Sequence, residues 1–232
     1  RNRTHEAFNI DTEIEVIRNF VNCDVYVRNP ELVAAMRPRF AEPNERLLVH
    51  LSNFRPVKRI QDVVEVFARV AKTMPARLML IGDGPDRSVA EYLARKHNVQ
   101  DLIHFLGKQD NVHELLPLAD LMLLPSEMES FGLAALEAMA CSVPSIATRV
   151  GGVPELIHDS GDPDKQNGLL FNVGDVDSMS AAAIDLLSDQ SRLETMAKAG
   201  RKTAQDHFCS SRVIPLYEDY YDRVVTRTQT TH

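Results

Sequence analysis

Tryptophan is absent from the 232-residue chain, and only three cysteines are present. Cys23, Cys141 and Cys209 are odd in number and far apart, and no Cys-x-x-Cys pair of a zinc or dithiol site occurs. This usage predicts free thiols and a reducing, cytoplasmic location. The eight histidines are scattered without metal-ligand spacing, so we expect no bound metal.

Basic residues are fewer than acidic ones: the chain has 26 Lys and Arg and 33 Asp and Glu, for a net charge of −7. Such a chain does not suit a nucleic-acid or anionic-membrane binder, although a local basic pocket can still hold an anion. The longest apolar run, near 115–124, is broken by Pro117 and Asp120, so no transmembrane segment is expected. The N-terminus lacks a methionine and an apolar signal core, which suggests a fragment or a processed piece.

Strand and helix patterns alternate along most of the chain. Short apolar runs predict strands at 47–51, 78–81, 102–106, 121–124, 144–147 and 168–171. Amphipathic or helix-forming segments predict helices at 60–71, 87–96, 112–119, 131–140, 190–207 and 213–228, with one more after Asp175. These repeated units predict an α/β fold with a Rossmann-like, doubly wound parallel sheet.

Ligands of such sheets bind beyond the carboxyl ends of the strands. The candidate binding loops are therefore 52–59, 82–86, 107–111, 125–132 and 148–154, all of them polar or glycine-rich.

The two ends of the chain have a different pattern. Residues 13–17 alternate like a strand, but Asn29-Pro30, Pro38 and Pro43 interrupt the segment after it. Residues 1–45 are therefore interpreted as a linker and the tail of an N-terminal domain that is missing from this chain. Near the other end, three tyrosines at helical spacing are expected to pack against the body of the protein, namely Tyr217, Tyr220 and Tyr221.

The most informative stretch is Pro125–Ala140, where a strand ends in a polar turn and a helix begins. The unpaired N–H groups of a helix N-terminus, with Gly132 allowing close approach, predict a phosphate site. Glu129 lies at its mouth, and Glu137 is eight residues further on. Two carboxylates beside a phosphate site suit a hydroxyl-rich ligand. The alternative is that the acidic residues only complement the helix dipole and that Glu137 is a solvated helix residue.

The pattern Glu-Ser-Phe-Gly-Leu-x-x-x-Glu-Ala-Met-Ala resembles the signature of family 4 glycosyltransferases, which have the GT-B fold. The resemblance covers most of residues 45–175, and further segments match the family in the same order. These are Phe54–Arg59, Ile81–Pro85, Phe105–Gly107, Ala119–Ser126 and Gly151–Glu155.

This resemblance implies roles for the motif residues. Glu129 would contact hydroxyls of the transferred sugar, and Glu137 would hold the ribose of the nucleotide. The backbone N–H groups of Phe131, Gly132 and Leu133 would bind the diphosphate. The resemblance implies no metal and no cofactor, because basic side chains and the helix N-terminus stabilise the leaving group instead.

The basic loop departs from the family pattern in two places. Lys58 would neutralise the diphosphate. Asn53 stands at the position where the family usually has an Arg. Arg55, two residues later, would supply that positive charge instead, unless it is a surface side chain. Arg59 stands where a glycine usually comes after the Lys. The pattern around Gly82 favours a tight strand-to-helix turn, although in the family this loop lines the nucleotide cleft, which would make Gly82 a donor-binding residue.

The segment Ser-Asn-Phe-Arg-x-Val-Lys-Arg and residues 10–21 are similar to a branch of the family that acts in bacillithiol biosynthesis. That branch moves N-acetylglucosamine from its UDP carrier to the hydroxyl of malate. A dianionic acceptor would suit Arg55 and Arg59, unless both are solvated.

The resemblance as a whole implies a retaining glycosyltransferase of which this chain is the C-terminal, donor-binding half. Residues 46–207 would be a nucleotide-sugar-binding domain, and 208–232 a helix that crosses back to the missing N-terminal domain. Such a half would bind a UDP-sugar weakly and be inactive alone. A member with another sugar or acceptor, a non-catalytic nucleotide-sugar-binding module and a homo-oligomer all stay open.

Overall fold

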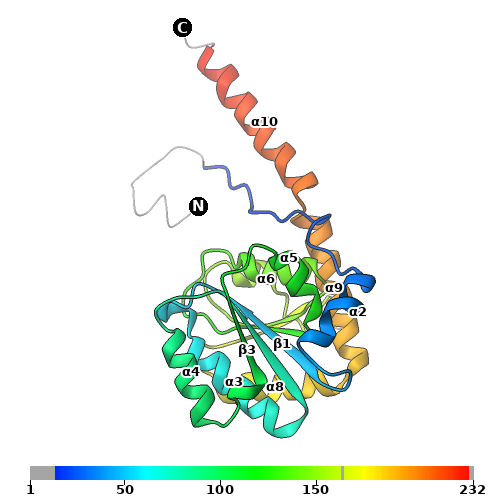
Figure 1. Cartoon of the computed structure of the whole chain (residues 1–232). Coiled ribbons are helices and arrows are strands. Elements are labelled where there is room, and N and C mark those ends of the chain that lie inside the picture. The colour runs from blue at the N-terminus through cyan, green and yellow to red at the C-terminus, as the bar shows by residue number, and fades with distance from the viewer. Residues whose placement is uncertain (1–13, 163–164, 230–232) are drawn as a thin grey trace.

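A computed structural model describes residues 14–162 and 165–229 (Figure 1). In this part of the chain, a six-stranded parallel sheet has the order β3-β2-β1-β4-β5-β6. The expected Rossmann-like, doubly wound α/β fold is confirmed. Each of the six strands expected in the sheet is found within two residues of its predicted ends: β1 (Arg46–Leu51), β2 (Ala76–Ile81), β3 (Ile103–Gly107), β4 (Leu121–Leu124), β5 (Ser145–Thr148) and β6 (Gly168–Phe171).

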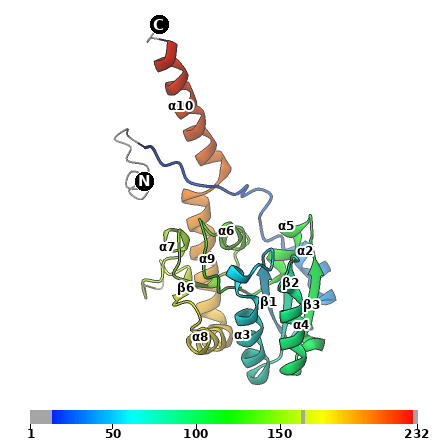
Figure 2. The same cartoon turned by 90° about the vertical axis from the view of Figure 1, so that its left-hand side faces the viewer.

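Helices cover both faces of the sheet (Figures 1 and 2). Helices α3, α4 and α8 enclose one apolar cluster, α5, α6 and α7 enclose the other, and α9 contributes side chains to both. Their bounds are α2 (Pro30–Met36), α3 (Ile60–Thr73), α4 (Arg87–Lys96), α5 (Val112–Leu115), α6 (Leu133–Ala140), α7 (Val153–Leu156), α8 (Val176–Ser188), α9 (Gln190–His207) and α10 (Ser210–Gln229). Short 3₁₀ turns lie at Arg37–Arg39, Pro56–Lys58, Gln100–Leu102 and Leu116–Leu118.

Strand β1 shows how the sequence divides between the two clusters. Leu47 and Val49 belong to the cluster beneath α6, whereas Leu48 belongs to the cluster beneath α3. Successive side chains of a strand point to opposite faces, so a strand buried on both sides needs a continuous apolar run. Each fully buried side chain of this size stabilises the fold by about 1.5–3 kcal/mol.

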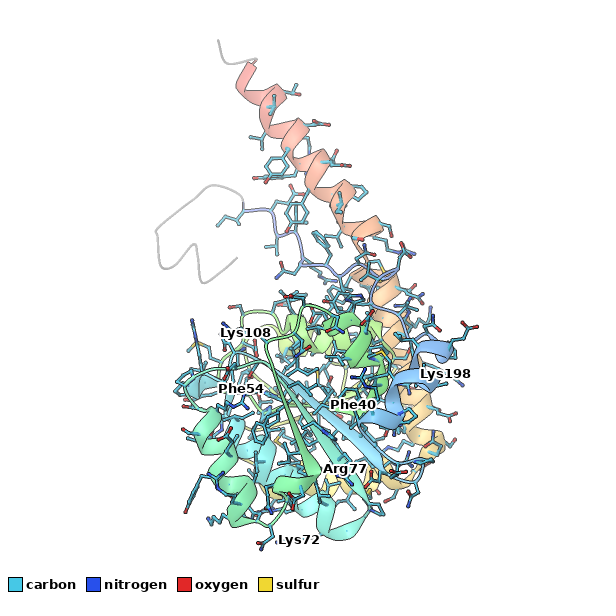
Figure 3. All side chains as sticks on the ribbon, viewed as in Figure 1. Phe40, Phe54, Lys72, Arg77, Lys108 and Lys198 are labelled. Carbon is cyan, nitrogen blue, oxygen red and sulfur yellow. A yellow bond between two sulfur atoms is a disulfide. The ribbon has the colours of Figure 1, made fainter. Side chains whose placement is uncertain are left out.

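The strand order fixes where a ligand can bind. The chain leaves β1 toward β2 on one side and later returns to pair β4 with β1 on the other. The crevice of a doubly wound sheet opens at this switch point, beyond the carboxyl ends of the strands. In Figure 3, Phe54 and Lys108 lie at this end of the sheet, and Lys72 and Arg77 lie at the opposite end.

The segment before β1 folds onto the sheet. The expected strand at 13–17 is wrong where the structure describes it, because residues 14–17 form no strand, and residue 13 lies outside the described ranges. Val21 and Ala41 are buried in the cluster beneath α6. The Asn29-Pro30 pair begins α2, since the Asn29 side chain accepts the Glu31 N–H at 2.9 Å and proline suits the first helical turn.

Helix α10 projects from the body (Figures 1 and 2). The expectation that three tyrosines pack against the body is therefore wrong. Tyr217 meets the ring of Phe20, Tyr220 lies beneath Arg223 of its own helix, and Tyr221 is 64% exposed. Among the described residues, no helix, α10 included, is both long and apolar enough to cross a membrane.

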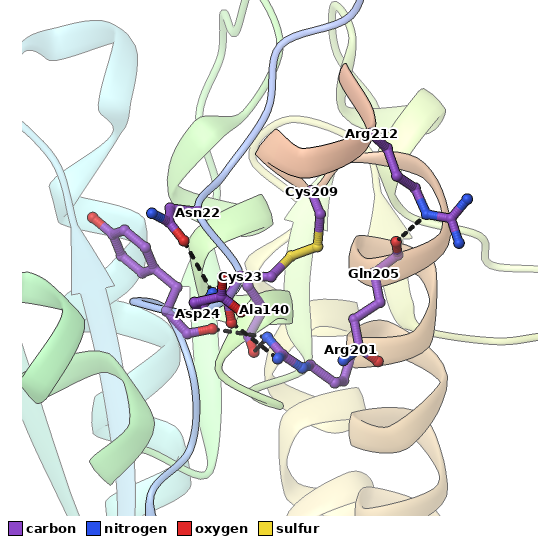
Figure 4. The surroundings of a disulfide bond; sticks show 9 residues. Asn22, Cys23, Asp24, Ala140, Arg201, Gln205, Cys209 and Arg212 are labelled. Atoms are coloured by element: carbon purple, nitrogen blue, oxygen red, sulfur yellow. Dashed lines mark hydrogen bonds between the residues drawn. A yellow bond between two sulfur atoms is a disulfide. The ribbon is translucent and has the colours of Figure 1, made fainter. Parts of the chain in front are cut away.

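The prediction of three free thiols is also wrong. Cys23 and Cys209 form a disulfide with their Cα atoms 5.5 Å apart (Figure 4). Cys141 is free and buried. The two cysteines are 186 residues apart in sequence, so their spacing gave no sign of pairing. They meet because Val21 forms a parallel bridge with Cys209.

Candidate functional site

A pocket of about 390 Å³ opens between the loops that come after β1 and β4. It lies at the switch point, as the strand order requires. Six of the predicted site residues line it, namely Asn53, Lys58, Glu129, Phe131, Gly132 and Leu133. The rest of its lining comes from Asn19, Leu51, Ser52, Ser130 and Ala134.

An ion pair joins the two loops at the pocket wall. Lys58 Nζ donates to Glu129 Oε1 at 2.5 Å, and Ser126 Oγ donates to the same oxygen at 2.9 Å. The side chains of Lys58 and Glu129 are only 21% and 11% exposed, so water screens this pair less than a surface pair. The pocket therefore presents a fixed ammonium group beside a fixed carboxylate.

Backbone contacts hold the same two loops together. The Glu127 N–H donates to the Val57 carbonyl at 2.8 Å. The Thr148 hydroxyl, at the end of β5, donates to the Ser126 carbonyl. The position of Glu129 relative to Lys58 is thus set by the main chain as well as by the ion pair.

Helix α6 begins at the pocket, two residues later than predicted. Gly132 is its N-cap residue and has a φ of +91°, in the left-handed region where a helix cannot continue. No side chain caps this end of the helix. The first N–H groups of α6, with their partial positive charge, therefore meet the pocket beside Leu133.

Glycine pairs support both loops from behind. A Cβ atom on Gly82 would lie 1.8 Å from the Ser52 carbonyl oxygen, and a Cβ atom on Gly151 would lie 1.6 Å from that of Glu129. Gly84 and Gly152 also lie too close to the main chain of these two loops for either to carry a Cβ atom. Gly82 does not line the pocket, so in this structure it supports the Ser52 loop and has no direct part in the pocket wall.

Glu137 lies on α6, one turn after Leu133, and is not among the residues that line the pocket. Burial raises its pKa, while its hydrogen bond with the side chain of Tyr26 opposes that shift. Burial, and after it the charge of Glu137 and the same hydrogen bond, raises the pKa of Tyr26 to about 12. Glu137 is therefore a partly buried, partnered carboxylate and not a solvated helix residue.

The two arginines of the basic loop do not face the pocket. Arg55 is exposed and lies outside the pocket lining. Arg59 binds the buried Asp62 through two hydrogen bonds of 2.6 and 3.1 Å, which raise the pKa of Arg59. Arg59 also has a φ of +50°, a left-handed conformation that a glycine would adopt without strain.

Sequence analysis missed His50, which supports the pocket from below. Its Nδ1 donates to the Leu123 carbonyl at 2.8 Å, and its Nε2 accepts from Ser52 Oγ at 2.8 Å. Ser52 Oγ in turn accepts the Phe54 N–H at 3.1 Å. Burial and the nearby Lys58 charge lower the pKa of His50 from 6.5 to about 4, so the ring is neutral at pH 7. The available signal was a polar residue within the apolar run 47–51, where the strand is buried.

The family model for glycosyl transferases group 1 matches residues 34–203. The chain belongs to this family. The group 1 glycosyltransferases are enzymes. The chain spans a little over half the length of the similar proteins described below, 57% of the first and 56% of the second.

Similar proteins share either the sequence or the fold. The chain is 43% identical, over 95% of its length and 57% of the relative, to an N-acetyl-alpha-D-glucosaminyl L-malate synthase of Bacillus anthracis. It also resembles the structure of Anabaena HepE in complex with UDP and glucose, with a TM-score of 0.79 at 21% identity over 91% of this chain and 56% of the other. A C-terminal domain of a group 1 glycosyl transferase from Francisella tularensis has a TM-score of 0.71 at 22% identity, over 82% of this chain and 99% of that one.

We expect Gly151→Ala to disrupt the site. The added Cβ clashes with the Glu129 carbonyl and also has to adopt a φ of +53°, so the free energy of unfolding should fall by roughly 3 kcal/mol or more. The matched control is Gly161→Ala, where φ is +70° but no atom lies within 4 Å, and here only the backbone strain of roughly 1–2 kcal/mol is expected. Urea denaturation of both variants measures the difference. Equal losses would contradict a supporting role for Gly151.

The buried His50 should make stability depend on pH. Its pKa is lower in the folded state, so the unfolded state binds the extra proton as the pH falls below 6.5. Stability should therefore fall by roughly 3 kcal/mol between pH 6.5 and pH 4 from this group alone. Urea denaturation across this range tests it, with His50→Asn expected to lose this component and the exposed His158→Asn expected to keep it. An unchanged pH profile in His50→Asn would refute the assignment.

Proposed function

We propose that this chain is the donor-binding half of a retaining glycosyltransferase that transfers N-acetylglucosamine from UDP-N-acetylglucosamine to the hydroxyl of L-malate. The observation that carries the proposal is the convergence of Lys58, Glu129 and the N-terminus of α6 on one pocket at the switch point. The substrates are suggested by the relative that is 43% identical and is named for them.

The diphosphate of the donor is proposed to lie against the N-terminus of α6. The N–H groups of Phe131, Gly132 and Leu133 would donate to its oxygens, and Lys58 would neutralise the charge that develops as the sugar leaves. Because Lys58 is already held at the pocket wall, little ordering is needed when the anion binds. The leaving group would thus be stabilised without a metal ion.

The sugar is proposed to lie over Glu129. Both hydrogen bonds to this carboxylate involve Oε1, so Oε2 can accept from a sugar hydroxyl without breaking either. Retention would result from attack by the acceptor hydroxyl on the same face as the leaving phosphate, which takes its proton. The acceptor would be bound by the N-terminal domain, so the chain alone would bind donor without turnover.

The roles of Glu137, Asn53, Arg55 and Gly82 are proposed with different support. Glu137 would accept hydrogen bonds from the ribose hydroxyls. To do so, its carboxylate has to keep its hydrogen bond with the Tyr26 side chain on a shared oxygen or give it up. Asn53 lies in the pocket lining and can donate to phosphate oxygens. Arg55 would reach malate or the diphosphate only from the exposed tip of its loop, and Gly82 would act through the loop it supports. The cytoplasmic location stays a prediction.

Calorimetric titration of the chain with UDP, ADP and GDP tests the donor site. We expect selective binding of UDP, and Lys58→Met should weaken it roughly 10- to 100-fold, because a hydrogen bond to a charged group contributes about 1.5–3 kcal/mol. Lys72→Met is the matched control, because Lys72 lies at the opposite end of the sheet (Figure 3). The Lys72→Met variant should bind UDP with the same affinity as the unmodified chain.

Two other outcomes would overturn parts of this proposal. Preference for ADP or GDP would assign another donor to the same site. Failure to bind any nucleotide would favour a non-catalytic module.

A further inference from the structure

The Cys23–Cys209 disulfide lies where two distant segments of the chain meet. The Val21 N–H donates to the Phe208 carbonyl at 2.9 Å, and the Ser210 N–H donates to the Val21 carbonyl at 2.9 Å. The disulfide adds a covalent bond beside this bridge. It therefore ties the segment that precedes the sheet to the start of α10, the helix that leaves the body (Figure 4).

The two sulfur atoms have different surroundings. Cys209 directly precedes α10, and its carbonyl accepts the N–H groups of Arg212 and Val213 at 2.9 and 3.1 Å, so it occupies the N-cap position of a 20-residue helix. The partial positive charge at a helix N-terminus stabilises a thiolate there. Cys23 lies in a segment without helix or strand and lacks this stabilisation. Cys209 is thus the better leaving group of the pair.

Access to the bond is narrow. Cys23 and Cys209 are 8% and 6% exposed. The folded active site of a protein reductant needs a wide approach to a disulfide, whereas a small flexible thiol does not. The geometry therefore favours a low-molecular-weight thiol as the reaction partner.

We propose that Cys23–Cys209 is a thiol–disulfide exchange site for a low-molecular-weight thiol. The thiolate of this molecule attacks Cys23 Sγ, the Cys23–Cys209 bond breaks, and its electron pair leaves on Cys209. A second thiol molecule attacks the mixed disulfide on Cys23, which releases the Cys23 thiolate and the oxidised dimer of the small thiol. The protein disulfide is thereby reduced, and two thiol molecules are oxidised.

Opening this bond would loosen one particular region. Arg201 holds the segment from the other side, through hydrogen bonds to the carbonyls of Cys23, Tyr26 and Ala140 at 3.0, 2.8 and 2.6 Å (Figure 4). Ala140 is the last residue of α6. Reduction would therefore leave Tyr26 attached but would free the first turn of α10 from its covalent link to the body.

Glutathione serves as the probe for this site. The oxidised chain is incubated with increasing ratios of reduced to oxidised glutathione, quenched with acid and mapped by mass spectrometry. We expect the mixed disulfide on Cys23 in at least about tenfold excess over Cys209. Full reduction should lower Tm by roughly 10 °C and speed amide hydrogen exchange at 21–26 and 209–213.

The double variant Cys23→Ser/Cys209→Ser provides the control. Its Tm should be as low as that of the reduced chain and should not respond to glutathione. A mixed disulfide mainly on Cys209, resistance of the native disulfide to glutathione, or three free thiols in the oxidised sample would each overturn the proposal.

Discussion

The contact between the loops after β1 and β4 is the constraint on which the site depends. The Glu127 N–H and the Val57 carbonyl join these loops through the main chain, and Lys58 and Glu129 join them through side chains. Glycines behind each loop let the supporting turns approach to distances that no Cβ atom tolerates. The strand order places the pocket at the switch point of the sheet. The contact between the two loops then sets the distances between Lys58, Glu129 and the N-terminus of α6.

This arrangement also distributes the positive charge of the basic loop. Arg59 neutralises the buried Asp62, and Arg55 is exposed outside the pocket. Lys58 is therefore the one cation among the described residues that line the pocket, in a chain whose net charge is −7. An anionic ligand would be held by one ammonium group and by main-chain N–H groups, so its affinity depends on geometry more than on total charge.

Much of the fold could be predicted from the sequence, because buried parallel strands require continuous apolar runs and β4 and β6 matched their predicted ends. The pocket lining was predictable at Lys58 and Glu129 from motif and spacing. Contacts between distant segments could not be predicted in this way. The Cys23–Cys209 pairing depends on a bridge between segments 186 residues apart. The role of His50 likewise depends on a carbonyl of the neighbouring strand, which local pattern does not reveal.

The most direct test of the account is an NMR titration of the ¹⁵N-labelled chain with UDP and, in parallel, with uridine, which lacks the diphosphate. If the N-terminus of α6 binds the diphosphate, the amide signals of Phe131, Gly132 and Leu133 should shift strongly with UDP and little with uridine. Equal shifts with both ligands, or UDP shifts confined to other parts of the chain, would contradict the anion site at this helix.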